Sequence, residues 1–249
     1  MSEAMKIIVF ASVKGGVGKT AAAVFAAQAA AAQGKRVVVI DADPNNCLTD
    51  FFLRDAPVAA IAEHSLYRAL VEGRSLADCE MEAHGGSGVD RMTIIPATPQ
   101  LARVGVELTH DPGVALRFPK AVRALGAEVV VIDTPPALTL ELNLALYAAD
   151  VVVVPVGANR WTVGAFPVIA EMVAQAAEAT GRRATLLALP AIVTVRETER
   201  LRKIATWMTT RSSIPKSAAV RSALNAGRSL KSGSLAWELY GALAEELVG

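Results

Sequence analysis

Nine consecutive residues near the amino terminus have the types and spacing of a phosphate-binding loop. Residues 12–20 read SVKGGVGKT, and the glycines let the backbone turn sharply and bring its N–H groups close to phosphate oxygens. Lys19 is placed to reach the β- and γ-phosphates of a nucleotide, and the Thr20 hydroxyl to ligate Mg²⁺. The segment therefore predicts a nucleotide site, formed by Gly15, Gly16, Val17, Gly18, Lys19, Thr20 and Ala21.

Aspartates stand at the ends of two further apolar runs. Asp41 and Asp43 close the first run, and Asp133 closes the second, EVVVID at residues 128–133. Ligands of open parallel sheets bind beyond the carboxyl ends of the strands. We therefore expect Asp133 to contact Mg²⁺, directly or through water, and Asp43 to orient an attacking water. For Asp41 two interpretations stay open, a loop cap and a catalytic carboxylate.

The elements that must position these residues follow from the apolar pattern. Short valine-rich runs predict buried parallel strands at residues 7–11, 36–41, 92–95, 128–133, 150–155 and 185–195. Helices are expected at residues 21–33, 65–71, 101–108, 114–125, 138–149, 163–180, 197–209 and 235–248. Residues 214–230 are expected to be a mostly irregular basic stretch. This alternation predicts an α/β domain with a mostly parallel twisted sheet and helices on both faces.

Composition narrows the class of protein. The 249 residues suffice for one large domain, and the 53% hydrophobic content is mostly alanine and valine. No apolar stretch approaches the ~20 residues of a transmembrane helix, and no signal peptide fits before the first strand. Cys47 and Cys79 lack metal-ligand spacing and are expected to be reduced thiols. We expect a cytoplasmic protein.

Charge is distributed unevenly along the chain. Residues 181–231 contain eleven basic side chains and two acidic ones, so this segment carries a net charge of +9 and the rest of the chain carries −8. Such asymmetry indicates a polyanionic partner. The alternative is a solvated basic face that serves a protein partner or an acidic lipid surface. The basic residues are Arg182, Arg183, Arg196, Arg200, Arg202, Lys203, Arg211, Lys216, Arg221, Arg228 and Lys231.

The loop, which a lysine opens as KGGVGKT, resembles the deviant Walker A motif of the ParA/MinD family of P-loop NTPases. The string IDTPP at residues 132–136 is similar to the family's Walker B segment, and IPKSAAVRSALNAGRSL is similar to its C-terminal segment. The resemblance covers essentially the whole chain as one domain, 1–249, closest to small Soj-like ParA proteins that have no N-terminal DNA-binding domain. After Asp43-Pro44 the chain reads Asn45-Asn46-Cys47 where relatives usually have Gln-Gly-Asn.

This resemblance implies roles for particular residues. Lys14 would cross the interface of an ATP-bound homodimer to contact the partner's nucleotide, and Lys19 and Asp43 would support hydrolysis. Thr20 and Asp133 would hold Mg²⁺. The DNA-contacting arginine of the family aligns best with Arg221, with Arg196 as a second match, and Arg200, Lys203 and Arg228 as further candidates.

The implied function is ATP-gated, sequence-independent DNA binding that drives plasmid or chromosome partition with a ParB-like centromere-binding or adaptor protein, at the nucleoid. The alternative is a ParA-like ATPase that positions another cargo, a protein organelle or a chemoreceptor cluster. A MinD-like membrane-associated ATPase is disfavoured because no Lys or Arg follows Lys231 in the last predicted helix.

Overall fold

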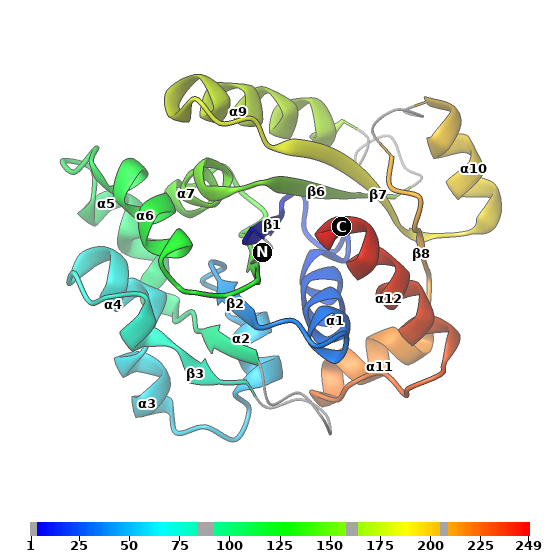
Figure 1. The fold of residues 1–249 in the computed structure, drawn as a ribbon, viewed down its shortest axis with the longest axis horizontal. Coiled ribbons are helices and arrows are strands. Elements are labelled where there is room, and N and C mark those ends of the chain that lie inside the picture. Colours follow the sequence, from blue (N-terminus) through cyan, green and yellow to red (C-terminus); the bar gives the residue numbers. More distant parts are fainter. Residues whose placement is uncertain (1–3, 84–91, 158–163, 205–208) are drawn as a thin grey trace.

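The computed structural model describes residues 4–83, 92–157, 164–204 and 209–249. Within these residues the strands form one sheet in the order β3-β4-β2-β5-β1-β6-β7-β8 (Figure 1). Neighbouring strands pair in parallel from β4 to β8, and the short β3 is antiparallel to β4. The strands are β1 (Lys6–Phe10), β2 (Val37–Asp41), β3 (Met81–Glu82), β4 (Met92–Ile95), β5 (Val129–Asp133), β6 (Val151–Val156), β7 (Thr185–Val193) and β8 (Ile214–Pro215).

Helices cover both faces of this sheet, and in Figure 1 α9 lies above β6 and β7, whereas α1 and α12 lie below them. Helices α4, α6, α7 and α9 pack on one face, whereas α1, α2, α11 and α12 pack on the other. The bounds of the helices are α1 (Lys19–Ala32), α2 (Cys47–Phe52), α3 (Val58–Glu63), α4 (Leu66–Val71), α5 (Val104–Glu107), α6 (Val114–Arg123), α7 (Leu140–Ala148), α9 (Ala165–Thr180), α10 (Val195–Ile204), α11 (Ala218–Ala226) and α12 (Leu235–Val248). Two 3₁₀ turns are η1 (Ala77–Cys79) and η2 (Pro99–Arg103).

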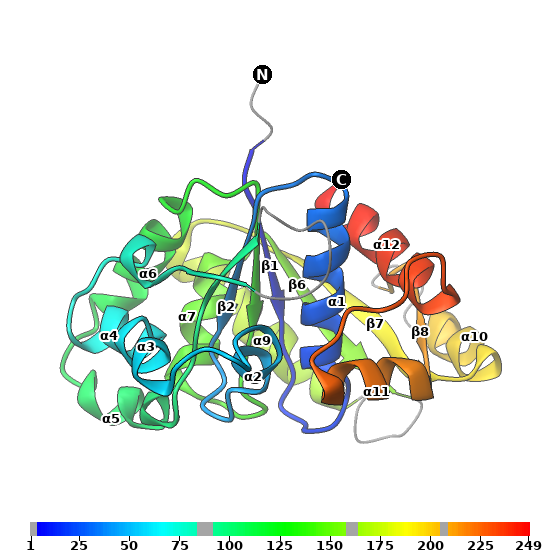
Figure 2. The same cartoon turned by 90° about the horizontal axis from the view of Figure 1, so that it is seen from below.

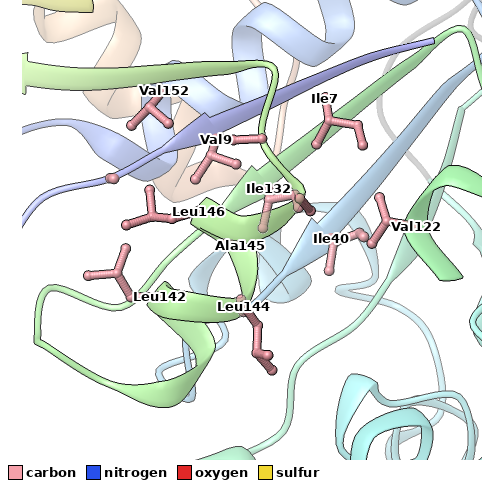
Figure 3. Packing of buried hydrophobic residues seen from close by; sticks show 14 of the residues in the cluster. Ile7, Val9, Ile40, Val122, Ile132, Leu142, Leu144, Ala145, Leu146 and Val152 are labelled. Carbon is pink, nitrogen blue, oxygen red and sulfur yellow. The ribbon is translucent and has the colours of Figure 1, made fainter. Parts of the chain in front are cut away.

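Successive residues of each central strand face opposite helical layers, because side chains alternate across a strand. In β1, Ile7 and Val9 belong to the core under α6, α7 and α9, whereas Ile8 and Phe10 belong to the core under α1 and α12. Figure 3 shows Ile7 and Val9 in the first of these cores, together with Leu142 of α7. Burial on both faces explains why the central strands are continuous apolar runs.

Helix α1 owes its alanine content to its position between the sheet and α12. Ala22, Ala23, Ala26, Ala27 and Ala30 are all at most 3% exposed, and α1 contacts both β5 and α12. Small side chains allow a helix to approach neighbours on several sides, and alanine has the highest helix propensity. The sequence pattern therefore reflects a central, fully covered helix.

The α/β architecture and the predicted central strands are confirmed. The expectation of an irregular stretch at residues 214–230 is wrong, because α11 occupies Ala218–Ala226. Its signals are present in the sequence: the Ser217 side chain accepts from the Val220 N–H, and Gly227 ends the helix at φ 60°. Thr209, expected to end a helix, instead forms a β-bridge with Ala188. Residues 205–208 of the predicted helix lie outside the described residues.

Candidate nucleotide-binding site

The glycine loop joins the carboxyl end of β1 to the amino end of α1. Gly16 and Gly18 adopt φ values of 72° and 89°, which lie in the left-handed region that favours glycine. The Ser12 Oγ accepts a hydrogen bond of 3.1 Å from the Lys14 N–H, so the turn is fixed from within. The loop backbone is exposed at residues 14–16, next to the amino terminus of a 14-residue helix. Exposed N–H groups at a helix amino terminus favour anion binding.

A buried aspartate faces the first turn of α1. The Thr20 Oγ1 donates a hydrogen bond of 2.6 Å to Asp133 Oδ2, across 113 residues of chain. Asp133 is 0% exposed, and its Oδ1 has no hydrogen-bond partner within the described structure. Burial raises the pKa of Asp133 to about 6, and the charge of Lys19 opposes this rise. A buried carboxylate oxygen without a donor is a position that a cation would satisfy.

Asp41 lies beside Asp133, because the two residues are paired in register on β2 and β5. Its Oδ2 accepts hydrogen bonds from Thr49 N and Oγ1, both 2.8 Å, and its Oδ1 accepts from Asp43 N at 3.1 Å. Burial and the nearby charge of Asp133 raise the pKa of Asp41 to about 7. These hydrogen bonds hold the turn after β2 and the start of α2 in place. Asp41 therefore has the geometry of a loop cap.

Asp43 is held by Asn45, the residue two positions after it. Its Oδ1 accepts from Asn45 N at 2.9 Å and from Asn45 Nδ2 at 3.0 Å, and only 7% of the residue is exposed. Asn46 then adopts φ 48° as α2 begins. The Asn45-Asn46 pair thus supplies a side-chain clamp and a left-handed residue, which asparagine tolerates better than most residues do.

The loop borders a cavity of about 490 Å³ that several elements line. Sequence patterns did not assign the residues that complete its wall. Apolar strand residues such as Ile214, and Tyr240 in a closing helix, carry no local signal of a ligand wall. The lining residues include Gly16, Gly18, Lys19, Thr20, Ala21, Cys47, Ile192, Ile214, Pro215, Lys216, Ser217, Arg221 and Tyr240.

One wall residue has an unusual backbone conformation. Ile192 adopts φ 57°, where a β-branched side chain is an outlier, at the register shift between Ala191 and Val193 of β7. Its Cδ1 lies 3.5 Å from the place that a Cβ on Gly18 would occupy. Such strain persists where the surroundings enforce it, and it is frequent at ligand sites. No pattern in the strand sequence could have indicated this conformation.

The basic candidates lie on two elements on the β8 side of the molecule (Figure 2). Arg196, Arg200 and Lys203 are exposed on α10, whereas Arg221 is exposed on α11 and also lines the cavity. Arg228 is exposed just after α11. The whole +9 segment does not share this side, because Arg182 pairs with Asp150 at 3.0 Å, at the amino-terminal edge of β6.

Metal binding at this site would depend on a bound nucleotide. The described residues contain no group of three or more His, Cys, Asp or Glu side chains placed to hold a metal ion by themselves. Mg²⁺ commonly takes one or two carboxylates and completes its shell with water and substrate phosphates, so Thr20 and Asp133 fit such a shared site.

Within the described residues, no helix has the length and apolar character needed to cross a membrane.

A family model described as an AAA domain (AAA_31) matches residues 5–184. The chain belongs to this family. Together with the relatives and structures described next, this membership confirms the predicted relation to ParA/MinD-type proteins such as Soj and the predicted P-loop α/β fold. The match of the AAA domain ends before α10, so the candidate basic residues lie outside it.

Individual relatives and structures agree with this assignment. The chromosome-partitioning ATPase Soj from Thermus thermophilus is 41% identical over 155 residues, which cover 62% of this chain and 55% of Soj. McdA from Cyanothece superposes with a TM-score of 0.84 at 25% identity, covering 98% of this chain and 100% of McdA.

A third similarity shows the shared fold alone. Cobyrinic acid a,c-diamide synthase from Mycobacterium smegmatis, solved with ADP and magnesium, superposes with a TM-score of 0.77 at 23% identity, covering 97% of this chain and 93% of the synthase. The aligned part of this chain spans little more than half the length of the first curated relatives it matches. The comparisons therefore establish the fold of this chain. A shared fold does not determine activity or partners, which depend on the residues of the site.

Proposed function

We propose that this AAA domain protein is an ATPase that dimerises with ATP, binds DNA without sequence preference, and drives plasmid or chromosome partition. The observation that carries the proposal is the 2.6 Å contact of Thr20 with Asp133, whose other oxygen is buried without a donor beside the glycine loop. A site of this kind is completed by a metal-bound nucleotide. We take residues 1–249 as one domain that performs this function.

The nucleotide would lie along the glycine loop, with its phosphates at residues 15–21 and its base and ribose in the 490 Å³ cavity. Lys19 is 6% exposed and its charge acts on the carboxylate of Asp133, and its ammonium group would contact the phosphates. Thr20 and Asp133 would hold Mg²⁺, which neutralises phosphate charge when it is bound. The loop, the cavity and these side chains together support binding of a magnesium–nucleotide complex.

Hydrolysis would depend on Asp43 and Lys14. Asp43 is clamped by Asn45 at the carboxyl end of β2, a position from which a carboxylate can orient a water for attack on the γ-phosphate. Lys14 lies on the exposed part of the loop, from which its side chain would reach the nucleotide of a second subunit. A cation from a partner stabilises the charge that develops on transferring phosphoryl groups.

DNA would be bound by exposed cations on α10, on α11 and just after α11, which a dimer would align on one continuous track. Each neutralised phosphate contributes a slope of about −0.9 to log K against log salt, so a dimer with twice the contacts binds far more tightly than one subunit. The proposed contacts are Arg196, Arg200, Lys203, Arg221 and Arg228. A ParB-like centromere-binding or adaptor protein would then couple this nucleoid-associated state to the cargo.

The test is DNA binding in three nucleotide states. Gel-shift titrations of two unrelated duplexes, run with a slowly hydrolysed ATP analogue, with ADP and without nucleotide, should give tight binding of both duplexes with the ATP analogue only. Arg221→Ala, compared at a saturating concentration of the ATP analogue because Arg221 also lines the cavity, should weaken binding and reduce the salt slope by about 0.9 for each phosphate that it no longer neutralises. Arg183→Ala is the matched control, since it removes an exposed arginine from the turn after α9. Equal affinity in all three states, or no binding in any, would contradict the proposal.

A further inference from the structure

An arginine outside the nucleotide site joins the segment after β2 to α11, the helix that carries Arg221. Arg54 follows α2, and its Nη2 donates to Asp50 Oδ2 at 2.9 Å and to the Asn225 carbonyl at 3.1 Å, across 171 residues of chain. Figures 1 and 2 both place α2 and α11 near one another, and the two helices are in contact. The pair with Asp50 is exposed on both sides, so its own contribution is small. The contact that matters is the one with α11.

The first half of this connection is rigidly attached to the strand ends. Thr49 of α2 donates twice to the buried Asp41, and its Oγ1 accepts from the Ala97 N–H at 2.9 Å. Helix α2 is therefore tied to the ends of β2 and β4 just after the turn that carries Asp43. The position of Arg54, which follows α2, is therefore also fixed.

The second half of the connection lies at the end of α11. The last carbonyls of a helix have no partner inside the helix, and the Arg54 guanidinium supplies a charged donor to one of them. Gly227 ends α11 at φ 60°, and a Cβ there would lie 3.0 Å from Arg54 Cζ, so the guanidinium packs directly against this turn. Arg221 precedes Asn225 by four residues, which puts both on one face of the helix.

We propose that Arg54 is a positioning residue that holds α11 against α2 and so sets the place of Arg221 at the DNA surface. The predicted effect on DNA binding rests on the proposed function. The predicted role of Arg54 in holding α11 does not. It makes α2 the physical link between the turn that carries Asp43 and the helix that carries Arg221. Arg54 is 38% exposed in its side chain, so a direct DNA contact is the rival explanation that the experiment must separate.

The first measurement is independent of DNA. Amide hydrogen exchange of α11 is compared in wild type, Arg54→Ala and Arg74→Ala. Arg74 is a matched control, because it also donates to a carbonyl and pairs with a carboxylate, both of Glu63, in the segment after α4. Arg54→Ala should speed exchange in the last turn of α11 about tenfold, the equivalent of one charge-assisted hydrogen bond, and Arg74→Ala should not. Unchanged exchange of α11 in Arg54→Ala would overturn the proposal, whatever the DNA result.

The second measurement is a double-mutant cycle with Arg221→Ala in ATP-dependent DNA binding. If Arg54 acts through Arg221, Arg54→Ala alone weakens binding, and the double variant binds no more weakly than Arg221→Ala. Additive losses of affinity, with a salt slope reduced by a further 0.9 or so, would show that Arg54 touches DNA itself and would overturn the positioning role. All variants are compared at a saturating concentration of the ATP analogue, because Arg221 also lines the cavity that would hold the nucleotide. Absence of DNA binding in the wild type contradicts the proposed function, and the exchange result then decides the role of Arg54.

Discussion

At the residue scale, the site depends on side chains far apart in the sequence that β-strand register brings together. Asp41 and Asp133 are opposite each other on β2 and β5, and Asp133 is opposite Phe10 at the end of β1. The glycine loop starts from that same end, so Thr20 reaches Asp133 at 2.6 Å. These placements could be predicted, because each residue follows a strand with a clear apolar pattern. The conformation of Ile192 could not, because it arises from an irregular pairing of β7.

Asp43 gives the sharpest prediction at this scale. Asp43→Ala removes the carboxylate proposed to orient water, while the glycine loop, Lys19 and Thr20 are untouched. The rate of ATP hydrolysis should therefore fall at least about 100-fold, the range that general acid–base groups contribute, whereas ATP affinity should stay within about threefold. Steady-state phosphate release and equilibrium nucleotide binding measure the two quantities. Hydrolysis at the wild-type rate would reduce Asp43 to a structural residue of the turn.

At the element scale, helix α1 joins the nucleotide loop to the rest of its core. Phe25 of α1 is fully buried and makes ring contacts with Phe51 of α2 and with Tyr240 of α12, at centroid distances of 5.9 and 5.2 Å. The alanine pattern predicted α1 well. Helix α11 was missed because its apolar face is short, although Ser217 and Gly227 mark its two ends. For α11, the residues at the two ends of the helix therefore indicated a helix more clearly than its hydrophobic periodicity did.

Phe25→Ala tests the weight of this aromatic contact. Removing a fully buried aromatic ring leaves a cavity where three helices meet, so the free energy of unfolding should fall by about 3–5 kcal/mol. Leu116→Ala is the control, since Leu116 is 56% exposed on α6, and it should change stability by no more than about 0.5 kcal/mol. Urea denaturation followed by circular dichroism measures both. A decrease below about 1 kcal/mol for Phe25→Ala would contradict this packing of α1.

At the scale of the whole molecule, the nucleotide loop, the aspartates and the amino end of α11 all lie at the carboxyl ends of the strands. The +9 charge of residues 181–231 indicated a polyanion, but sequence alone could not sort these residues by position, because their elements fold to different parts of the protein. Arg182 pairs with Asp150, and Arg202 donates to the Arg211 carbonyl, so both serve the fold. The exposed arginines of α10 and α11 remain as the candidates for a partner surface.

Dimerisation is a property of the whole molecule, and Lys14 tests it. Lys14→Ala should keep nucleotide affinity within about threefold, because the cation is proposed to act on the partner's nucleotide, yet should remain monomeric with ATP. Light scattering with the ATP analogue and without it gives the mass directly. Lys120→Ala, which removes an exposed lysine of α6, should dimerise as the wild type does. A Lys14→Ala protein that dimerises normally would exclude the cross-subunit role.

Mg²⁺-dependent nucleotide binding at the glycine loop is the property on which dimerisation, hydrolysis and DNA binding all depend. Equilibrium titration of a fluorescent ATP analogue, with Mg²⁺ and with EDTA, should show tight binding to the wild type only with Mg²⁺. Lys19→Ala and Thr20→Ala should each weaken Mg²⁺-dependent binding by at least about 100-fold, because each removes a charge-assisted contact. Ser222→Ala, an exposed hydroxyl on α11, serves as the control and should bind as the wild type does. Unchanged affinity in both loop variants, or binding indifferent to Mg²⁺, would contradict the central claim that this loop and Asp133 form a magnesium–nucleotide site.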